Sequence, residues 1–236
     1  MNIVIIGAGP VGCYIGYLLA CGGQKVTIYE NHPEIGLPIQ CTGLLTHDFD
    51  AFGIPTDVFL VNTLSRIDVF SPHENAQIPQ KEYLVCRLKF DNYLATLAKD
   101  AGVTILVSHS FVRKEGDSLI ISRKVEGDEI AVKADIVIAA DGPLSPTAHA
   151  FGFFELERVN YYGVQAIVSG LFDPNAFQTY FGTKVCPGLF AWVVPESASR
   201  ARVGLACLKD SRLYFEQFMK EKNFTALEMQ AGTIPM

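Results

Sequence analysis

The first thirty residues divide into apolar runs separated by short breaks. Residues 3–6 are wholly apolar, residues 13–20 form a helix-length apolar run, and residues 26–30 form a second strand-length run that ends at Glu30. Two strand-length apolar runs joined by a helix-length run are typical of a βαβ unit. The pattern therefore predicts two parallel strands with a helix between them.

The break after the first run reads Gly7-Ala8-Gly9-Pro10-Val11-Gly12. In this position the three glycines permit a tight turn, the close approach of a pyrophosphate, and contact between helix and sheet. The pyrophosphate is expected at the helix N-terminus, where unpaired N–H groups and the helix dipole favour an anion. Glu30 follows 21 residues after Gly9, and an acidic residue at about this spacing along the sequence binds the adenosine ribose hydroxyls. The spacing therefore predicts a dinucleotide site.

The middle of the chain continues this domain. We expect a Gly- and Pro-rich loop at 31–45, a hairpin formed by 63–71 and 76–78, a helix from Cys86 to about Lys99, and strands at 103–107, 118–122, 129–133 and 134–139. The last strand ends in Asp141-Gly142. Ligands of open α/β sheets bind beyond the carboxyl ends of strands, which favours a cofactor role for Asp141, although Asp-Gly is also a common plain turn.

From Tyr161 the sequence becomes aromatic and strand-rich. Four short strands between 161 and 207, followed by a helix at 212–222, predict a second, antiparallel domain. We expect an α/β fold with a Rossmann-like domain at 1–157, from which a β excursion near 60–86 joins the second sheet. An antiparallel substrate domain follows at 158–210. Residues 211–236 are expected to return toward the first domain.

The charge of the chain, its N-terminal pattern and the spacing of its cysteines and histidines argue against several classes of protein. The 236 residues carry a formal charge of −6, which argues against nucleic acid as the main partner. The N-terminus lacks a basic region and is broken by glycines and Pro10, which argues against a signal peptide. The six cysteines and five histidines show neither disulfide nor metal-ligand spacing. We therefore expect free thiols, no metal, and a cytoplasmic protein that either stays in solution or associates with a membrane.

Five segments together resemble the geranylgeranyl reductase family of FAD-dependent oxidoreductases, within the para-hydroxybenzoate-hydroxylase-like superfamily. They are 7–12 with Glu30, 37–43, Arg87 with Phe90-Asp91, 140–142, and 187–195. The last segment matches the family's P-x-x-Y-x-W-x-F-P signature in spacing, with Phe190 in place of Tyr and Val194 in place of Phe.

The resemblance implies FAD as the cofactor and assigns three sets of residues. The catalytic residue is Cys41, on a loop that approaches the isoalloxazine. The cofactor-binding residues are Gly7, Gly9, Pro10, Gly12, Glu30, Asn31, Gln40, Arg87, Asp141 and Gly142. The substrate-binding residues are Phe181, Pro187, Phe190 and Trp192. The sequence leaves alternatives open: Cys41 as an inert thiol, Arg87 as a solvated charge, and the aromatic residues as plain sheet core.

The implied activity is hydride transfer from reduced FAD to double bonds of a geranylgeranyl-type lipid. With one glycine motif, NAD(P)H or ferredoxin is expected to act as an external electron donor, and a peripheral membrane contact would give access to the lipid. The alternatives are a flavin-dependent monooxygenase or halogenase, and a non-catalytic remnant. The segment after Ser145 lacks the family's Arg, and the chain ends before the family's second flavin motif. The resemblance therefore implies a C-terminal truncation, with a separate C-terminal half as a further partner.

Overall fold

The computed structural model describes residues 1–153 and 158–236. The chain divides into two compact units. The first unit comprises Met1–Pro38 and Arg87–Glu157, and the second comprises Ile39–Cys86 and Arg158–Met236. Each unit is therefore assembled from segments that are far apart in the sequence.

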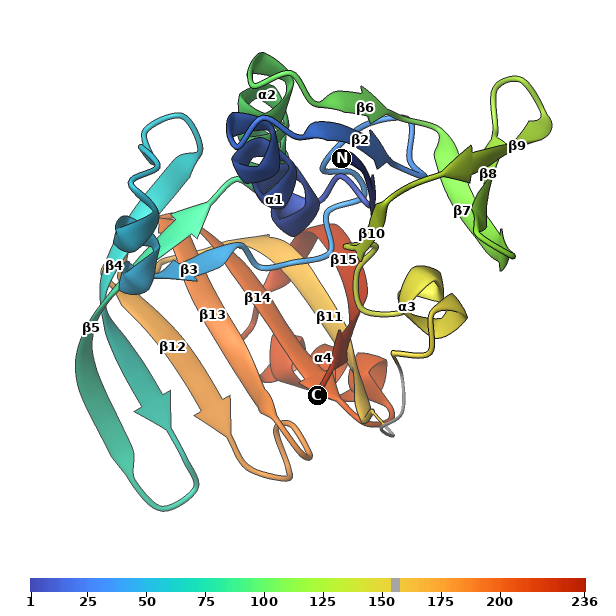
Figure 1. The fold of residues 1–236 in the computed structure, drawn as a ribbon. Coiled ribbons are helices and arrows are strands. Elements are labelled where there is room, and N and C mark those ends of the chain that lie inside the picture. The colour runs from blue at the N-terminus through green and yellow to red at the C-terminus, as the bar shows by residue number, and fades with distance from the viewer. Residues whose placement is uncertain (154–157) are drawn as a thin grey trace. The chain divides into compact units, whose positions relative to one another are not determined.

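The first unit is built on a four-stranded parallel sheet in the order β10-β1-β2-β6 (Figure 1). Its strands are β1 (Asn2–Ile6), β2 (Lys25–Tyr29), β6 (Thr104–Leu106) and β10 (Ile136–Ala139). β1 pairs in parallel with both β2 and β10. This arrangement confirms the expected α/β class and the Rossmann-like βαβ unit.

Both faces of this sheet are covered, which explains why β1 is apolar without alternation. On one face α1 (Pro10–Cys21) lies beside α2 (Arg87–Asp100). An ideal Cβ at Gly16 of α1 would lie 3.0 Å from Ile28 Cδ1, so the helix packs closely on the sheet. On the other face the small sheet β7 (His109–Glu115), β8 (Ser118–Arg123) and β9 (Asp128–Lys133) contributes Leu119 and Ile121 to a core with β1 and β2. The short helix α3 (Pro146–Ala150) contacts β7.

The second unit is built on an eight-stranded sheet in the order β15-β11-β14-β13-β12-β4-β5-β3. Its strands are β3 (Leu44–Thr46), β4 (Leu60–Phe70), β5 (Asn75–Val85), β11 (Asn160–Ser169), β12 (Ala176–Phe181), β13 (Phe190–Ser197), β14 (Arg200–Cys207) and β15 (Thr225–Pro235). A 3₁₀ helix, η1 (His47–Phe52), follows β3.

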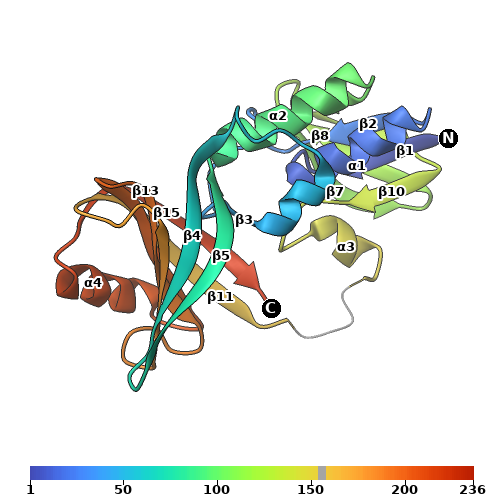
Figure 2. The ribbon, with the colours of Figure 1, turned by 90° about the vertical axis from the view of Figure 1, so that its left-hand side faces the viewer.

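The two faces of the large sheet have different cores. Helix α4 (Ser211–Glu221) covers one face (Figure 2), where Phe215, Phe218 and Met219 pack on alternate residues of β11, β13 and β14. The opposite face holds a second cluster that includes Leu64, Trp192 and Val194. Polar side chains of β11 and β14 also belong to this second face, because strand residues alternate between faces.

The end of the chain differs from the sequence-based expectation. Residues 211–236 belong to the second unit: α4 contacts β11 and β14, and β15 pairs antiparallel with β11 at the edge of the large sheet. Strand β15 was missed because most of its side chains are exposed at a sheet edge, so the chain lacks a clear apolar alternation there. The segment 39–59, expected in the first domain, also lies in the second unit.

Candidate functional site

The turn between β1 and α1 is closely packed at two of its glycines. Gly7 has φ +102°, and an ideal Cβ there would lie 2.3 Å from the carbonyl oxygen of Ala140. An ideal Cβ at Gly12 would lie 2.0 Å from the carbonyl oxygen of Gly7. Any side chain at either position would collide with backbone. These two glycines therefore maintain the turn itself.

Gly9 is different, because space is open beside it. Its backbone is extended (φ −69°, ψ −179°), and an ideal Cβ would meet nothing within 4 Å. Gly9 is the N-cap of α1, with Pro10 at the first helical position, no side-chain cap and no acidic residue in the first turn. An uncapped helix N-terminus that faces open space suits an anion. The residues present therefore fit a pyrophosphate.

Glu30 lies buried at the end of β2, beside this turn. Its Oε2 accepts the Ala8 N–H at 2.8 Å, and its Oε1 accepts the His32 N–H at 2.9 Å and lies 2.7 Å from His32 Nδ1. These contacts fix the carboxylate orientation and leave about one of its four acceptor positions for a ribose hydroxyl. Sequence reasoning missed His32. The neighbouring Asn31 accepts Lys124 Nζ through its carbonyl at 2.7 Å.

Asp141 is brought to the same turn, since an ideal Cβ at Gly7 would lie 2.9 Å from its Cα. Its side chain, however, orders the start of α3: Oδ2 accepts the Thr147 N–H at 3.0 Å, and the Ser145 hydroxyl donates to Oδ1. Gly142 follows with φ +87°. The backbone of 141–142 thus lies beside the glycine turn, while the carboxylate has a local structural role.

Arg87 begins α2 and forms a two-pronged ion pair with Asp91 at 3.0 Å for both contacts. Burial raises the pKa of the Asp91 carboxyl, and the Arg87 guanidinium opposes that rise. Gly36 packs against this pair, since an ideal Cβ there would lie 3.3 Å from Asp91 Cβ. Arg87 therefore pairs with a residue of its own helix and is not simply a charge surrounded by solvent. Its contact with the cofactor stays a prediction.

The predicted catalytic cysteine lies on a turn of the second unit, Gln40–Gly43, which we call the Cys41 turn. Cys41 is exposed, and its Sγ accepts the Gly43 N–H at 3.4 Å. An ideal Cβ at Gly232 of β15 would lie 3.1 Å from the carbonyl oxygen of Gln40. Strand β15 therefore passes close beneath the start of the turn.

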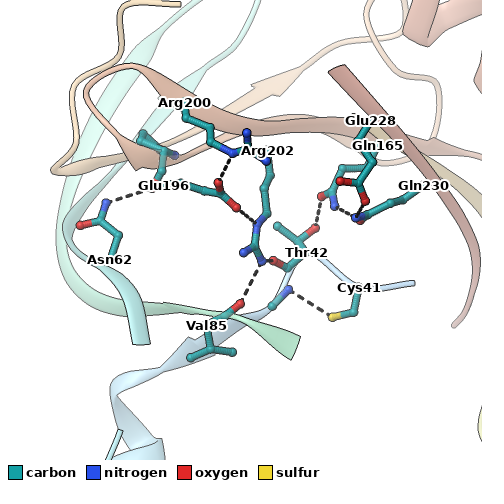
Figure 3. A network of polar contacts seen from close by, with 12 residues as sticks. Cys41, Thr42, Asn62, Val85, Gln165, Glu196, Arg200, Arg202, Glu228 and Gln230 are labelled. Carbon is teal, nitrogen blue, oxygen red and sulfur yellow. Dashed lines mark hydrogen bonds and ion pairs between the residues drawn. The ribbon is translucent and has the colours of Figure 1, made fainter. Parts of the chain in front are cut away.

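Two polar side chains of the large sheet bind the Cys41 turn (Figure 3). The Thr42 hydroxyl donates to Gln165 Oε1 at 2.7 Å, and Trp192 Nε1 donates to the same oxygen at 3.0 Å. Arg202 donates through one nitrogen to the carbonyl of Thr42 and, at 3.0 Å, to that of Val85. Sequence reasoning missed Gln165 and Arg202. For Gln165 the available signal was a long polar residue in the middle of a mostly apolar strand, whereas Arg202 lies near the start of β14, two residues after Arg200.

The aromatic residues of the predicted pocket form a row that runs from the surface into the core. Phe181 is 40% exposed, its ring centroid is 5.3 Å from that of Phe190, and the Phe190 ring is 6.2 Å from Trp192. Trp192 is 8% exposed and belongs to the core cluster, which agrees with the alternative interpretation of this residue as sheet core. Pro187 precedes Gly188, which packs on the Tyr161 ring. Substrate contact by these residues stays a prediction.

Two further properties concern metals and membranes. Within residues 1–153 and 158–236, no three His, Cys, Asp or Glu side chains gather in a way that could hold a metal ion. In the same described residues, every helix is too short or too polar to cross a bilayer.

Comparison with known proteins places these features in context. The profile of the NAD(P)-binding Rossmann-like domain matches residues 5–53. The chain is 30% identical, over its whole length, to the digeranylgeranylglycerophospholipid reductase of Methanocaldococcus jannaschii and covers 65% of that protein. It is 31% identical to digeranylgeranylglycerophospholipid reductase 2 of Methanothermobacter thermautotrophicus, again over its whole length, and covers 66% of it. The chain thus spans slightly less than two thirds of the length of these relatives.

Solved structures share the fold. A geranylgeranyl bacteriochlorophyll reductase-like protein of Thermoplasma acidophilum superposes with a TM-score of 0.90 at 24% identity, covering 99% of this chain and 66% of that chain. A flavin-dependent brominase superposes with a TM-score of 0.77 at 18% identity, covering 99% of this chain and 68% of that chain. The fold of this chain is therefore shared with both solved structures.

Proposed function

We propose that this chain belongs to an FAD-dependent reductase that saturates double bonds of an isoprenoid lipid. The observation that carries the proposal is the alignment of the whole chain with two digeranylgeranylglycerophospholipid reductases. The fold alone would not select this activity, because brominases share it.

The first unit supplies the binding site for the ADP half of FAD in this proposal. The open space at Gly9 and the uncapped N-terminus of α1 accommodate the pyrophosphate, and the remaining acceptor position of Glu30 takes a ribose hydroxyl. Asn31, Gln40, Arg87 and the 141–142 backbone complete the proposed set of cofactor-binding residues. NAD(P)H or ferredoxin is the proposed external electron donor.

The second unit supplies the catalytic and lipid-binding side chains. When bound, reduced FAD would supply a hydride to one alkene carbon. Cys41 has an exposed thiol, and we assign to it the proton that the other alkene carbon receives. Exposed Phe181 and half-buried Phe190 offer aromatic surface to an isoprenoid chain, which has no polar handle. Trp192 supports Phe190 from within the core.

The test is reduction of a geranylgeranyl lipid by the purified, flavin-loaded protein with dithionite as electron source. We expect the lipid to gain a pair of hydrogens for each saturated double bond, measured by mass spectrometry. Cys41→Ser should slow turnover and retain the bound flavin, because the hydroxyl of Ser is a weaker acid than a thiol. Unchanged lipid mass in a preparation that carries flavin would contradict the proposal.

The same preparation distinguishes the rival activities. A monooxygenase or halogenase would consume NAD(P)H in an oxygen-dependent reaction without saturating the lipid. A non-catalytic remnant would not retain flavin through purification.

A further inference from the structure

We propose that Gln165 and Arg202 are positioning residues that hold the Cys41 turn in one conformation around its exposed thiol. The proposal rests on the proposed function, since it gives Cys41 a catalytic role. Gln165, Arg202 and Trp192 are all at least nine-tenths buried, whereas Cys41 is exposed. A buried polar framework therefore binds the turn that carries the exposed Cys41 thiol (Figure 3).

The end groups of the network fix the direction of its hydrogen bonds. The Trp192 indole can only donate, so Gln165 Oε1 must be the acceptor at 3.0 Å. Because that oxygen is an acceptor only, the Thr42 hydroxyl must donate to it at 2.7 Å. Gln165 Nε2 then donates to Gln230 Oε1 at 2.8 Å, and Gln230 Nε2 donates to the Glu228 carboxylate at 3.2 Å. The amide of Gln165 is therefore held in one orientation from both ends.

Movement of the turn would remove a hydrogen bond from each of two buried side chains. Gln165 Oε1 would lose one of its two donors, and Arg202 would lose the Thr42 carbonyl. Loss of these hydrogen bonds to buried side chains costs free energy, so the turn resists displacement.

Arg202 holds the turn from the other side. Its guanidinium bridges the carbonyls of Thr42 and Val85, and the Val85 N–H donates back to the Gly43 carbonyl at 2.8 Å. Glu196 accepts Arg202 Nε at 2.8 Å and balances its charge. A planar guanidinium can bind two carbonyls and a carboxylate at once, which a lysine ammonium cannot do with the same geometry. Arg202 thus ties the turn to the end of β5.

This arrangement gives Trp192 a second role. Its indole N–H and the Thr42 hydroxyl share one oxygen of Gln165, so Trp192 acts on the Cys41 turn through Gln165. The Trp of the sequence signature then contributes to the cysteine turn as well as to the core.

The test measures hydrogen exchange of the peptide covering residues 39–46 in the flavin-loaded protein. Gln165→Leu and Arg202→Met should each speed exchange in this peptide by about three- to tenfold, because the turn loses a hydrogen bond to a buried partner. Thr42→Val should do the same, whereas Thr42→Ser keeps the donor hydroxyl and should match the parent. Trp192→Phe should speed exchange less, because the Thr42 bond remains.

Matched controls come from the same unit. Asn62→Leu removes an amide that donates to the carbonyls of Pro174 and Pro195, and Arg66→Met removes an arginine that pairs with Asp68 and Asp173. Neither control should change exchange at 39–46. In steady-state reduction of the lipid, the Gln165 and Arg202 variants should lower kcat and leave KM near the parental value.

Three results would overturn the proposal. Unchanged exchange at 39–46 would show that the turn does not depend on these side chains. Exchange that rises equally across all strands of the large sheet would show a general loss of stability. A raised KM with unchanged exchange would assign Gln165 and Arg202 to the lipid pocket. If the flavin-loaded parent reduces no lipid, the proposed function fails, and exchange alone then decides whether the turn is held.

Discussion

The glycines of the turn after β1 differ in what a side chain would meet, and this difference separates folding from binding. We expect Gly9→Val to fold normally but to bind FAD at least tenfold more weakly, because its side chain enters the open space in front of α1. We expect Gly12→Ala to destabilise the protein by about 1–3 kcal/mol, because its Cβ collides with the Gly7 carbonyl. Flavin fluorescence titration measures the FAD affinity of Gly9→Val, and thermal unfolding measures the stability of Gly12→Ala. Parental FAD affinity in Gly9→Val would contradict the proposed pyrophosphate site.

The cysteines differ in reactivity because burial disfavours the thiolate. Burial raises the pKa of Cys13 and of Cys207 to about 12, and it also raises the pKa of Cys186, whose Sγ lies 3.3 Å from Cys207 Sγ. At mildly alkaline pH we expect iodoacetamide to label Cys21 and Cys41 in the folded protein, and to label these three buried thiols only after unfolding. Mass spectrometry of the labelled peptides measures this. Equal labelling rates for Cys207 and Cys21 in the folded state would contradict the burial of Cys207.

Local motifs and long-range contacts were not equally predictable at the residue scale. Gly7, Gly9, Gly12 and Glu30 could be assigned from the sequence because their spacing along one βαβ unit determines their geometry. Gln165 and Arg202 could not, because their contact with Thr42 depends on the pairing of β11 with β14 and on a loop more than a hundred residues away.

At the scale of elements, a small residue of β14, Gly204, lies opposite a large residue of β13, Trp192. An ideal Cβ at Gly204 of β14 would lie 2.6 Å from Trp192 Cζ2 and 2.7 Å from the Val164 carbonyl oxygen. We expect Gly204→Ala to displace the Trp192 ring and to lower the free energy of unfolding by about 1–3 kcal/mol. Chemical unfolding measures the stability, and tryptophan fluorescence reports the ring, because Trp192 is the only tryptophan in the sequence. Unchanged fluorescence and stability would contradict this packing.

The elements that the sequence predicted carry either an unbroken apolar run, as β1 does, or a clear helical period. Helix α4 carries such a period, because Phe215, Phe218 and Met219 recur at helical spacing and bury one face. Strand β15 and the short helices lacked such a signal. Leu227 and Met229 of β15 are more than half exposed, since an edge strand has a partner on one side only.

At the scale of the whole molecule, the two units should respond differently to the cofactor. The first unit carries the glycine turn and Glu30, although its two segments are separated in the sequence by 39–86. A ligand present at a hundred times its Kd stabilises the state that binds it by about 2.7 kcal/mol. We therefore expect FAD to raise the thermal midpoint of the protein and to slow hydrogen exchange in β1 and β2.

The control for this prediction is Gly9→Val, in which the same concentration of FAD should change both quantities less, because tenfold weaker binding lowers the stabilisation to about 1.4 kcal/mol. Because Gly9 is not packed against backbone, the substitution should leave the midpoint without FAD near the parental value. If FAD instead stabilised the parent and Gly9→Val equally, the cofactor would have to bind elsewhere. The glycine turn would then have only a structural role, and the assignment of the first unit as the site for the ADP half of FAD would fail.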